Sequence, residues 1–334
     1  MRSLFLALVG SRIQIHGSLL RALFASVNKI EKVFHLPSLW TRQDADRIMN
    51  IVDQTKDSDF DISTTGVKED VTLIIVCAPK DFSMLHLVIP NACRAINDFE
   101  IKKIEIIVPD NKHPSDVIAS LPTLANKIEV LDESQVIPCA EIRRLFSHSF
   151  PGRENWCLQQ FLKFFSVLNC ESKYALIVDA DTILLNKREW VDGDKRILMT
   201  PTFEYQAQYY SLLENFSVFH SQPEFSFVPH HMFYNCEKFA RMAQELQITD
   251  SLYFAKKVEE FADKTTHAPF CIDYELFAQY MYGREREAVV LGRWSNISMR
   301  RSTYLKFLNH KIGQVLLSRL FHSISLHSWA ETSI

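Results

Sequence analysis

Two carboxylates separated by one residue follow an apolar run near the middle of the chain. The segment KYALIVDADTILL places Asp179 and Asp181 directly after Tyr174–Val178, a run of strand length. Two carboxylates at this spacing can approach one cation where the chain turns beyond the strand. Such oxygen ligands suit Mn²⁺ or Mg²⁺, and the ion could neutralise a leaving diphosphate. Asp-x-Asp also recurs by chance in turns, so the spacing alone leaves a structural turn open.

The segment just before this strand predicts a helix with polar side chains gathered on one face. Residues 155–168, NWCLQQFLKFFSVL, carry apolar residues at helical spacing. Four other side chains fall together on a different face: Trp156, Gln159, Gln160 and Lys163. An indole, two amides and an ammonium group could receive a base, a ribose and a phosphate, although an ordinary amphipathic surface fits the pattern equally well. Arg153 would bring a guanidinium group to the same end.

Apolar runs of strand length alternate with helical patterns from residue 71 onward. Residues 71–78 (VTLIIVCA) and 104–109 (IEIIVP) predict buried strands, and helical spacing in 82–99 connects them as a βαβ unit. Further strands are predicted at 127–131, 174–178 and 196–199. This order predicts an α/β fold with an open, mostly parallel sheet covered by helices. Ligands of such sheets bind outside the carboxyl ends of the strands.

Composition narrows the classes of function. Lys and Arg number 37 against 40 Asp and Glu, so the net charge of -3 provides no basic field for nucleic acid. The seven cysteines are odd in number and form no close CxxC pair, which argues against structural zinc. They indicate buried thiols in a reducing compartment, and hence a cytoplasmic protein.

Residues 1–70 are predicted to be a helical and linker extension, and residues 71–334 to be one domain. The first thirty residues carry four basic residues and no acidic one. This bias favours peripheral contact with an anionic surface, namely the inner face of the membrane. A helix packed on the domain is the alternative. The apolar run 4–9 is far shorter than the roughly 20 residues that span a bilayer. Residues 41–70 are rich in Asp and indicate a polar connector.

The segment GRENWCLQQFLKF followed by LIVDADTILL resembles bacterial glycosyltransferase-like proteins of the GT-A, or nucleotide-diphospho-sugar transferase, superfamily. The resemblance covers residue 71 to about residue 329. It implies a GT-A-like, Rossmann-related three-layer sandwich. The implied activity is metal-dependent transfer of a sugar from a nucleotide-sugar donor to a glycan or other surface-polysaccharide acceptor.

The resemblance also implies roles for particular residues. The nucleotide would be held after the first strand, and a contact to ribose or base would follow the second; the positions are Ala78, Pro79, Lys80 and Asp110. The tryptophan-bearing helix and Asp179 would complete donor binding. A histidine near the carboxyl terminus would be a third metal ligand, for which His327 is the candidate and His322 the competitor. A histidine merely packed on the surface fits His327 equally well.

Two later segments resemble the acceptor side of the site. In PHHMFYN, His230 and His231 point to opposite faces of a strand, so at most one reaches the site, and we take His231 as a catalytic candidate. In CIDYELFAQY, Asp273 and Glu275 would diverge by about 200° on a helix. Either could be the general base of an inverting reaction. Asp273 could instead simply cap the helix.

Two other functions compete with glycosyl transfer. A nucleotidyltransferase of the same fold usually has a glycine-rich loop after the first strand, whereas the loop here, APKDFSML, contains no glycine. A non-catalytic scaffold with a degenerate fold would be expected to have lost the carboxylates, which are present. Neither GxSxG nor a P-loop pattern occurs, so the sequence gives no support to a hydrolase or an NTPase.

Overall fold

The computed structural model describes residues 68–202, 206–216, 223–266, 268–292, 294–305, 313, 315, 317–318 and 321–326. The predicted extension before residue 68, its membrane contact and the metal-ligand candidate His327 lie outside the described residues. Within them, no helix combines the length and the apolar character that crossing a membrane requires.

A five-stranded sheet forms the centre of the molecule. Its strands are β1 (Asp70–Val76), β2 (Glu100–Val108), β3 (Ile128–Asp132), β4 (Tyr174–Val178) and β7 (His231–Asn235). Their order is β3-β2-β1-β4-β7, with the first four parallel and β7 antiparallel to β4. The continuous apolar runs of β1 and β4 are buried because helices cover both faces of the sheet. The predicted α/β fold with a mostly parallel sheet is confirmed.

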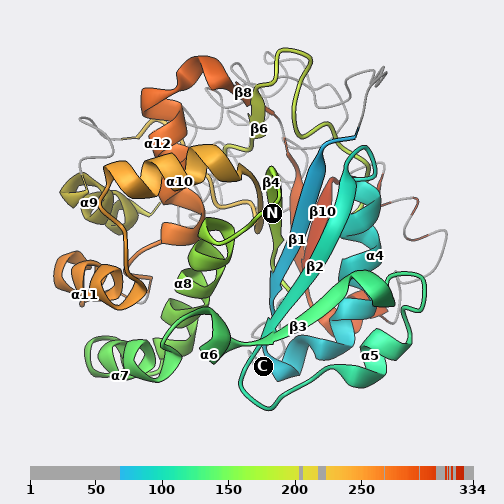
Figure 1. Cartoon of the computed structure of the whole chain (residues 1–334), viewed down its shortest axis with the longest axis horizontal. Coiled ribbons are helices and arrows are strands. Elements are labelled where there is room, and N and C mark those ends of the chain that lie inside the picture. The colour runs from blue at the N-terminus through green and yellow to red at the C-terminus, as the bar shows by residue number, and fades with distance from the viewer. Residues whose placement is uncertain are drawn as a thin grey trace, which may run out of the picture.

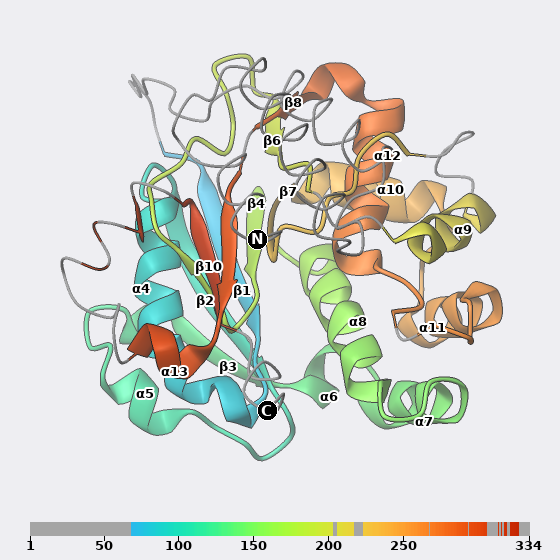
Figure 2. The ribbon, with the colours of Figure 1, turned by 180° about the vertical axis from the view of Figure 1, so that it is seen from behind.

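Helices lie on both faces of this sheet, as Figures 1 and 2 show. One face carries α4 (Leu85–Ala95) and α5 (Ser115–Ala119). The other carries α7 (Cys139–Ser149), α8 (Glu154–Leu168), α10 (Cys236–Glu245), α11 (Ser251–Phe261) and α12 (Phe277–Arg284). The helix predicted within 82–99 is confirmed as α4, but a 3-10 turn, η1 (Pro79–Met84), precedes it.

Shorter elements complete the fold. Two small sheets consist of β5 (Thr182–Leu184), β10 (Ser323–Leu326) and β9 (Asn296–Met299), and of β6 (Ile197–Met199) and β8 (Val289–Leu291). The remaining elements are η2 (Ala125–Lys127), α6 (Glu133–Val136), α9 (Ala207–Asn215), the π-helix η3 (Ile272–Leu276), η4 (Arg286–Ala288) and α13 (Arg301–Thr303). The strand predicted at 196–199 exists, but it pairs with β8 outside the central sheet.

Helix α8 is the element that links the sheet to the rest of the domain. Phe161 and Phe164 pack against Phe254 of α11, with ring centroids 5.5 and 5.2 Å apart. Each such fully buried side chain contributes about 1.5–3 kcal/mol through removal from water. Helix α8 also packs against β1, and these contacts together fix its polar side chains relative to the end of that strand.

Candidate active site

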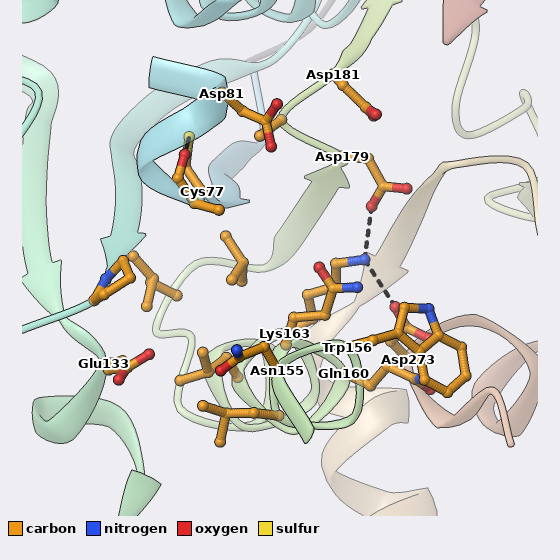
Figure 3. A pocket seen from close by; sticks show the side chains of 18 of the residues that line it. Cys77, Asp81, Glu133, Asn155, Trp156, Gln160, Lys163, Asp179, Asp181 and Asp273 are labelled. Carbon is orange, nitrogen blue, oxygen red and sulfur yellow. Dashed lines mark hydrogen bonds and ion pairs between the residues drawn. The ribbon is translucent and has the colours of Figure 1, made fainter. Parts of the chain in front are cut away.

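A cavity of about 1010 Å³ opens at the carboxyl ends of β1, β2 and β4. Helix α8 forms the facing wall, and η3 closes one end (Figure 3). The cavity brings together many of the predicted residues: Ala78, Pro79, Lys80, Arg153, Trp156, Gln159, Gln160, Lys163, Asp179, Asp181 and Asp273. Three others do not line it: Asp110, His231 and Glu275. The site therefore lies at the sheet edge where the strand order predicted a ligand.

Lys163 is the centre of a buried ionic network. Its ammonium group donates to Asp179 Oδ1 at 2.6 Å and to Asp273 Oδ2 at 2.8 Å, and its side chain is only 4% exposed (Figure 3). The hydroxyl of Tyr274 also donates to Asp179 Oδ1, at 2.6 Å. Lys163 thus holds two carboxylates from distant parts of the chain in one place. Its charge is directed at these carboxylates.

The network fixes the ionisation of its members. Burial by itself would raise the pKa of Asp179, but the positive charge of Lys163 and the hydrogen bond and charge of His230 outweigh it and hold this pKa well below its ordinary value. Burial would lower the pKa of Lys163, but Asp179 and Asp273 together raise it. Asp179 is therefore a carboxylate, and Lys163 an ammonium ion, at neutral pH.

His230 completes the surroundings of Asp179. Its Nδ1 lies 3.2 Å from Asp179 Oδ2, and its carbonyl oxygen accepts the backbone N–H of Asp179 at 3.0 Å. Its φ is 63°, in the left-handed region that residues other than glycine rarely adopt. This backbone conformation turns the ring of His230 toward the cavity. His230, and not the predicted catalytic residue His231, lines the cavity.

His231, the catalytic candidate, is buried away from the cavity. Its Nδ1 lies 2.9 Å from the carbonyl oxygen of Pro229, and its ring centroid lies 4.1 Å from that of Trp294. Burial, followed by the charge of Arg188, lowers the pKa of His231 to about 3. The ring is therefore neutral at neutral pH.

This lowered pKa predicts a pH-dependent stability. In the unfolded chain a histidine titrates at about pH 6.5, so stability is fully present above that pH and is lost as pH falls toward 3. The expected slope is up to about 1.4 kcal/mol per pH unit, or roughly 2 kcal/mol by pH 5. Urea unfolding at pH 7 and pH 5 should show this loss in the wild type and in the exposed-site control His148→Phe. In His231→Phe the loss of unfolding free energy between pH 7 and pH 5 should be smaller by this contribution of His231. Equal losses in all three proteins would contradict the prediction.

Glu275 is also buried outside the cavity. Its carboxylate accepts from Ser226 Oγ at 2.6 Å, from the backbone N–H of Phe227 at 2.9 Å and from Gln279 Nε2 at 2.8 Å. Burial raises its pKa, although these hydrogen bonds act in the opposite direction. Glu275 and Asp273 diverge on the π-helix, as helical geometry predicts. Glu275 holds η3 to the segment at residues 226–227, and Asp273 faces the cavity.

The polar face predicted on α8 divides into two groups. Gln160 is buried, donates to the carbonyl of Phe270 at 3.4 Å and accepts the N–H of Ile272 at 2.9 Å, so it positions the start of η3. Trp156 and Gln159 are half-buried and line the cavity. The Arg153 guanidinium stacks 4.6 Å from the centre of the Trp156 ring.

Arg153 brings a guanidinium group to the cavity and has one buried donor. Its Nε is buried and has no hydrogen-bond partner among the described residues. A buried donor without an acceptor costs free energy, and a ligand in the cavity does not reach this atom because it has almost no accessible surface. Lys80 lines the same cavity. Asp110, in contrast, accepts the N–H of Ser134 at 3.2 Å and lies outside the cavity lining.

Asp179 and Asp181 are the residues that could hold a divalent cation. Among the residues that the structure describes, no group of three or more His, Cys, Asp or Glu side chains could bind a metal by itself. Mg²⁺ is commonly bound through one or two carboxylates together with substrate phosphates and water. The two carboxylates, which Figure 3 shows next to each other at one end of the cavity, fit an ion of this kind.

The fold and the cavity are those of an α/β protein with a ligand site at the carboxyl edge of its sheet. No protein-family model matches the chain, and no curated protein is similar to it in sequence. Among solved structures, an active-site mutant of LgtC is 13% identical, with a TM-score of 0.46, and the alignment covers 76% of this chain and 86% of the other. The galactosyltransferase LgtC with donor and acceptor sugar analogs is 12% identical, with a TM-score of 0.43 and coverage of 76% and 86%. Mouse xyloside xylosyltransferase 1 in its apo form is 12% identical, with a TM-score of 0.42 and coverage of 79% and 99%.

Proposed function

We propose that this protein is a glycosyltransferase that binds a nucleotide-sugar donor in the cavity and a divalent cation, Mn²⁺ or Mg²⁺, at Asp179 and Asp181. One observation carries the proposal. The carboxylate pair at the end of β4 opens into a cavity large enough for a nucleotide sugar, and the basic residues Lys80 and Arg153 line the same cavity. The acceptor would be a glycan or another surface polysaccharide.

The charges at this end of the cavity support metal dependence. Asp179 and Asp273 share the positive charge of Lys163, and Asp181 adds a further carboxylate to the lining of the cavity. An anionic diphosphate would be repelled from such a site unless a cation came with it. When bound, the metal would supply electrostatic stabilisation of the departing nucleoside diphosphate.

The chain's own residues would bind and orient the reactants. Lys163 and His230 hold Asp179 ionised and fixed in direction. Of the three catalytic candidates only Asp273 lines the cavity, so we propose it as the general base if the reaction inverts at the anomeric carbon. The ring of Trp156 offers an apolar face for a sugar or a base. All seven cysteines are free thiols, which is in keeping with the proposed cytoplasmic location.

Calorimetric titration with UDP, GDP and CMP, with and without Mn²⁺, tests this proposal. We expect one nucleotide to bind only in the presence of the metal, and we expect binding to be lost in the double variant Asp179→Ala/Asp181→Ala. Asp116→Ala, which removes an exposed carboxylate on α5, is the control that should bind like the wild type. Equal binding in EDTA would rule out the metal site. Failure of a folded protein to bind any of the nucleotides would favour a non-catalytic scaffold.

A further inference from the structure

Three polar side chains form the part of the cavity that lies away from the carboxylate pair. Glu133, the first residue of α6, has a side chain that is 8% exposed, and its Oε1 accepts Arg143 Nη2 at 2.5 Å. Arg143, on α7, also donates through Nε to Asn155 Oδ1 at 3.0 Å. All three residues line the cavity, and Figure 3 shows Glu133 and Asn155 on the side away from Asp181. We call these three residues the Glu133 cluster.

The hydrogen bonds within the Glu133 cluster determine what it can offer a ligand. Arg143 occupies Oε1 of Glu133 and the amide oxygen of Asn155. An ionised carboxylate can only accept hydrogen bonds, and an amide whose oxygen is already engaged offers its NH₂ group as a donor. A ligand group at this end must therefore present N–H or O–H donors to Glu133 and an acceptor to Asn155.

The order of the strands tells which part of a nucleotide reaches this cluster. Glu133 directly follows β3, and the carboxylate pair directly follows β4, with β2 and β1 between these strands. Three steps between neighbouring strands separate the two positions by about 14 Å. The ribose is joined to the diphosphate through a single methylene group and lies close to it. The base is the far end of the molecule and is the part that can span this separation.

We propose that the Glu133 cluster recognises the base of the donor nucleotide and selects guanine. The inference rests on the proposed function, because it assumes that the diphosphate binds at the end of β4. Guanine presents two neighbouring donors, N1–H and the 2-amino group, to the carboxylate of Glu133, and its O6 lies next to them as an acceptor for Asn155. Uracil flanks its single N–H with carbonyl oxygens, and cytosine and adenine place a ring-nitrogen lone pair beside their amino group. A carboxylate repels each of these lone pairs.

Titration of the wild-type protein with a series of nucleoside diphosphates in Mn²⁺ tests the selection directly. The probes are GDP, UDP, CDP, ADP and inosine diphosphate, which differs from GDP only by the missing 2-amino group. We expect GDP to bind at least about tenfold more tightly than each of the others, as a paired set of base contacts provides. UDP binding as tight as GDP, or inosine diphosphate binding as tight as GDP, would overturn the proposal.

The variant Glu133→Gln tests whether Glu133 is the residue that selects the base. Glu133→Gln keeps an acceptor for Arg143 but removes the negative charge, so we expect GDP affinity to fall about tenfold or more while UDP affinity changes less than about threefold. Glu141→Gln, the same change at an exposed position of α7 outside the cavity, should behave like the wild type. Equal losses for all nucleotides would contradict base recognition. If the variant fails to fold, the wild-type series still decides.

The two proposals can fail separately. Metal-dependent binding of UDP that disappears in Asp179→Ala/Asp181→Ala, without a preference for GDP, would leave the transferase proposal standing and overturn guanine selection. Absence of binding for all five nucleotides would overturn both proposals.

Discussion

Replacing Lys163 by Met is expected to lower the free energy of unfolding by about 3–5 kcal/mol, because it removes one partner of a buried ionic network. The carboxylates of Asp179 and Asp273 would then share a buried site without the cation that lies 2.6 and 2.8 Å from them. Methionine has nearly the same shape as the lysine stem, so lost packing contributes little. Urea unfolding at pH 7 measures the loss.

The control for this experiment is a solvent-exposed lysine that is also paired with a carboxylate. Lys102→Met removes an ammonium group that is 51% exposed and pairs with Glu100, and it should cost less than about 1 kcal/mol. The deficit of Lys163→Met should shrink as pH falls below about 4, because the wild type then loses the stability that the depressed pKa of Asp179 provides, whereas the variant has no such stability to lose. Equal losses for the two lysines would contradict the network.

Asp179→Asn and Asp181→Asn should each reduce the rate of sugar transfer by about 100- to 1000-fold, the effect expected when one group that stabilises transition-state charge is removed. The measurement is release of nucleoside diphosphate from the donor whose nucleotide binds in calorimetry, with Mn²⁺ present. Stability should separate the two variants. Asp179→Asn leaves Lys163 without one of its buried partners and should unfold more easily than the wild type. Asp181 is half-buried and is not one of the two carboxylates bound by Lys163, so its replacement should cost less stability than that of Asp179.

Asp116→Asn on the exposed side of α5 provides the matched change and should keep both the rate and the stability of the wild type. A full rate in Asp181→Asn would remove the proposed metal ligand from the reaction. A full rate in both variants would mean that the carboxylate pair serves the structure alone.

The sheet could be predicted because its strands are buried on both faces. Residues 71–76 and 174–178 are almost wholly apolar and β-branched or aliphatic, and such runs show their secondary structure without reference to the rest of the chain. The carboxylate pair could also be predicted, because its two charged residues follow directly after one of these apolar runs. Residues 196–199 were placed in the wrong sheet because a three-residue strand carries too little pattern to identify its partner.

The internal contacts of the site could not be predicted in this way. Lys163 pairs with Asp273, which lies 110 residues further along the chain, and Gln160 bonds to Ile272 over a similar separation. Helical spacing places both side chains on one face, but only the packing of η3 against α8 shows that this face is buried. Which of His230 and His231 faces the cavity depends on a single positive φ angle. Histidine carries no sequence signal for that conformation.

Strand β10 contacts the segment of the carboxylate pair but is synthesised long after the central sheet. The N–H of Leu326 donates to the carbonyl oxygen of Asp181 at 2.8 Å, and Ser325 Oγ lies 3.0 Å from Thr182 Oγ1. The ribosome adds roughly 5–20 residues per second, so β1, β2, β3 and β4 all emerge well before β10. A nascent chain can therefore form its central sheet early, while the backbone at Asp181 still lacks its neighbour. The surroundings of the carboxylate pair are therefore complete only once β10 has paired with β5.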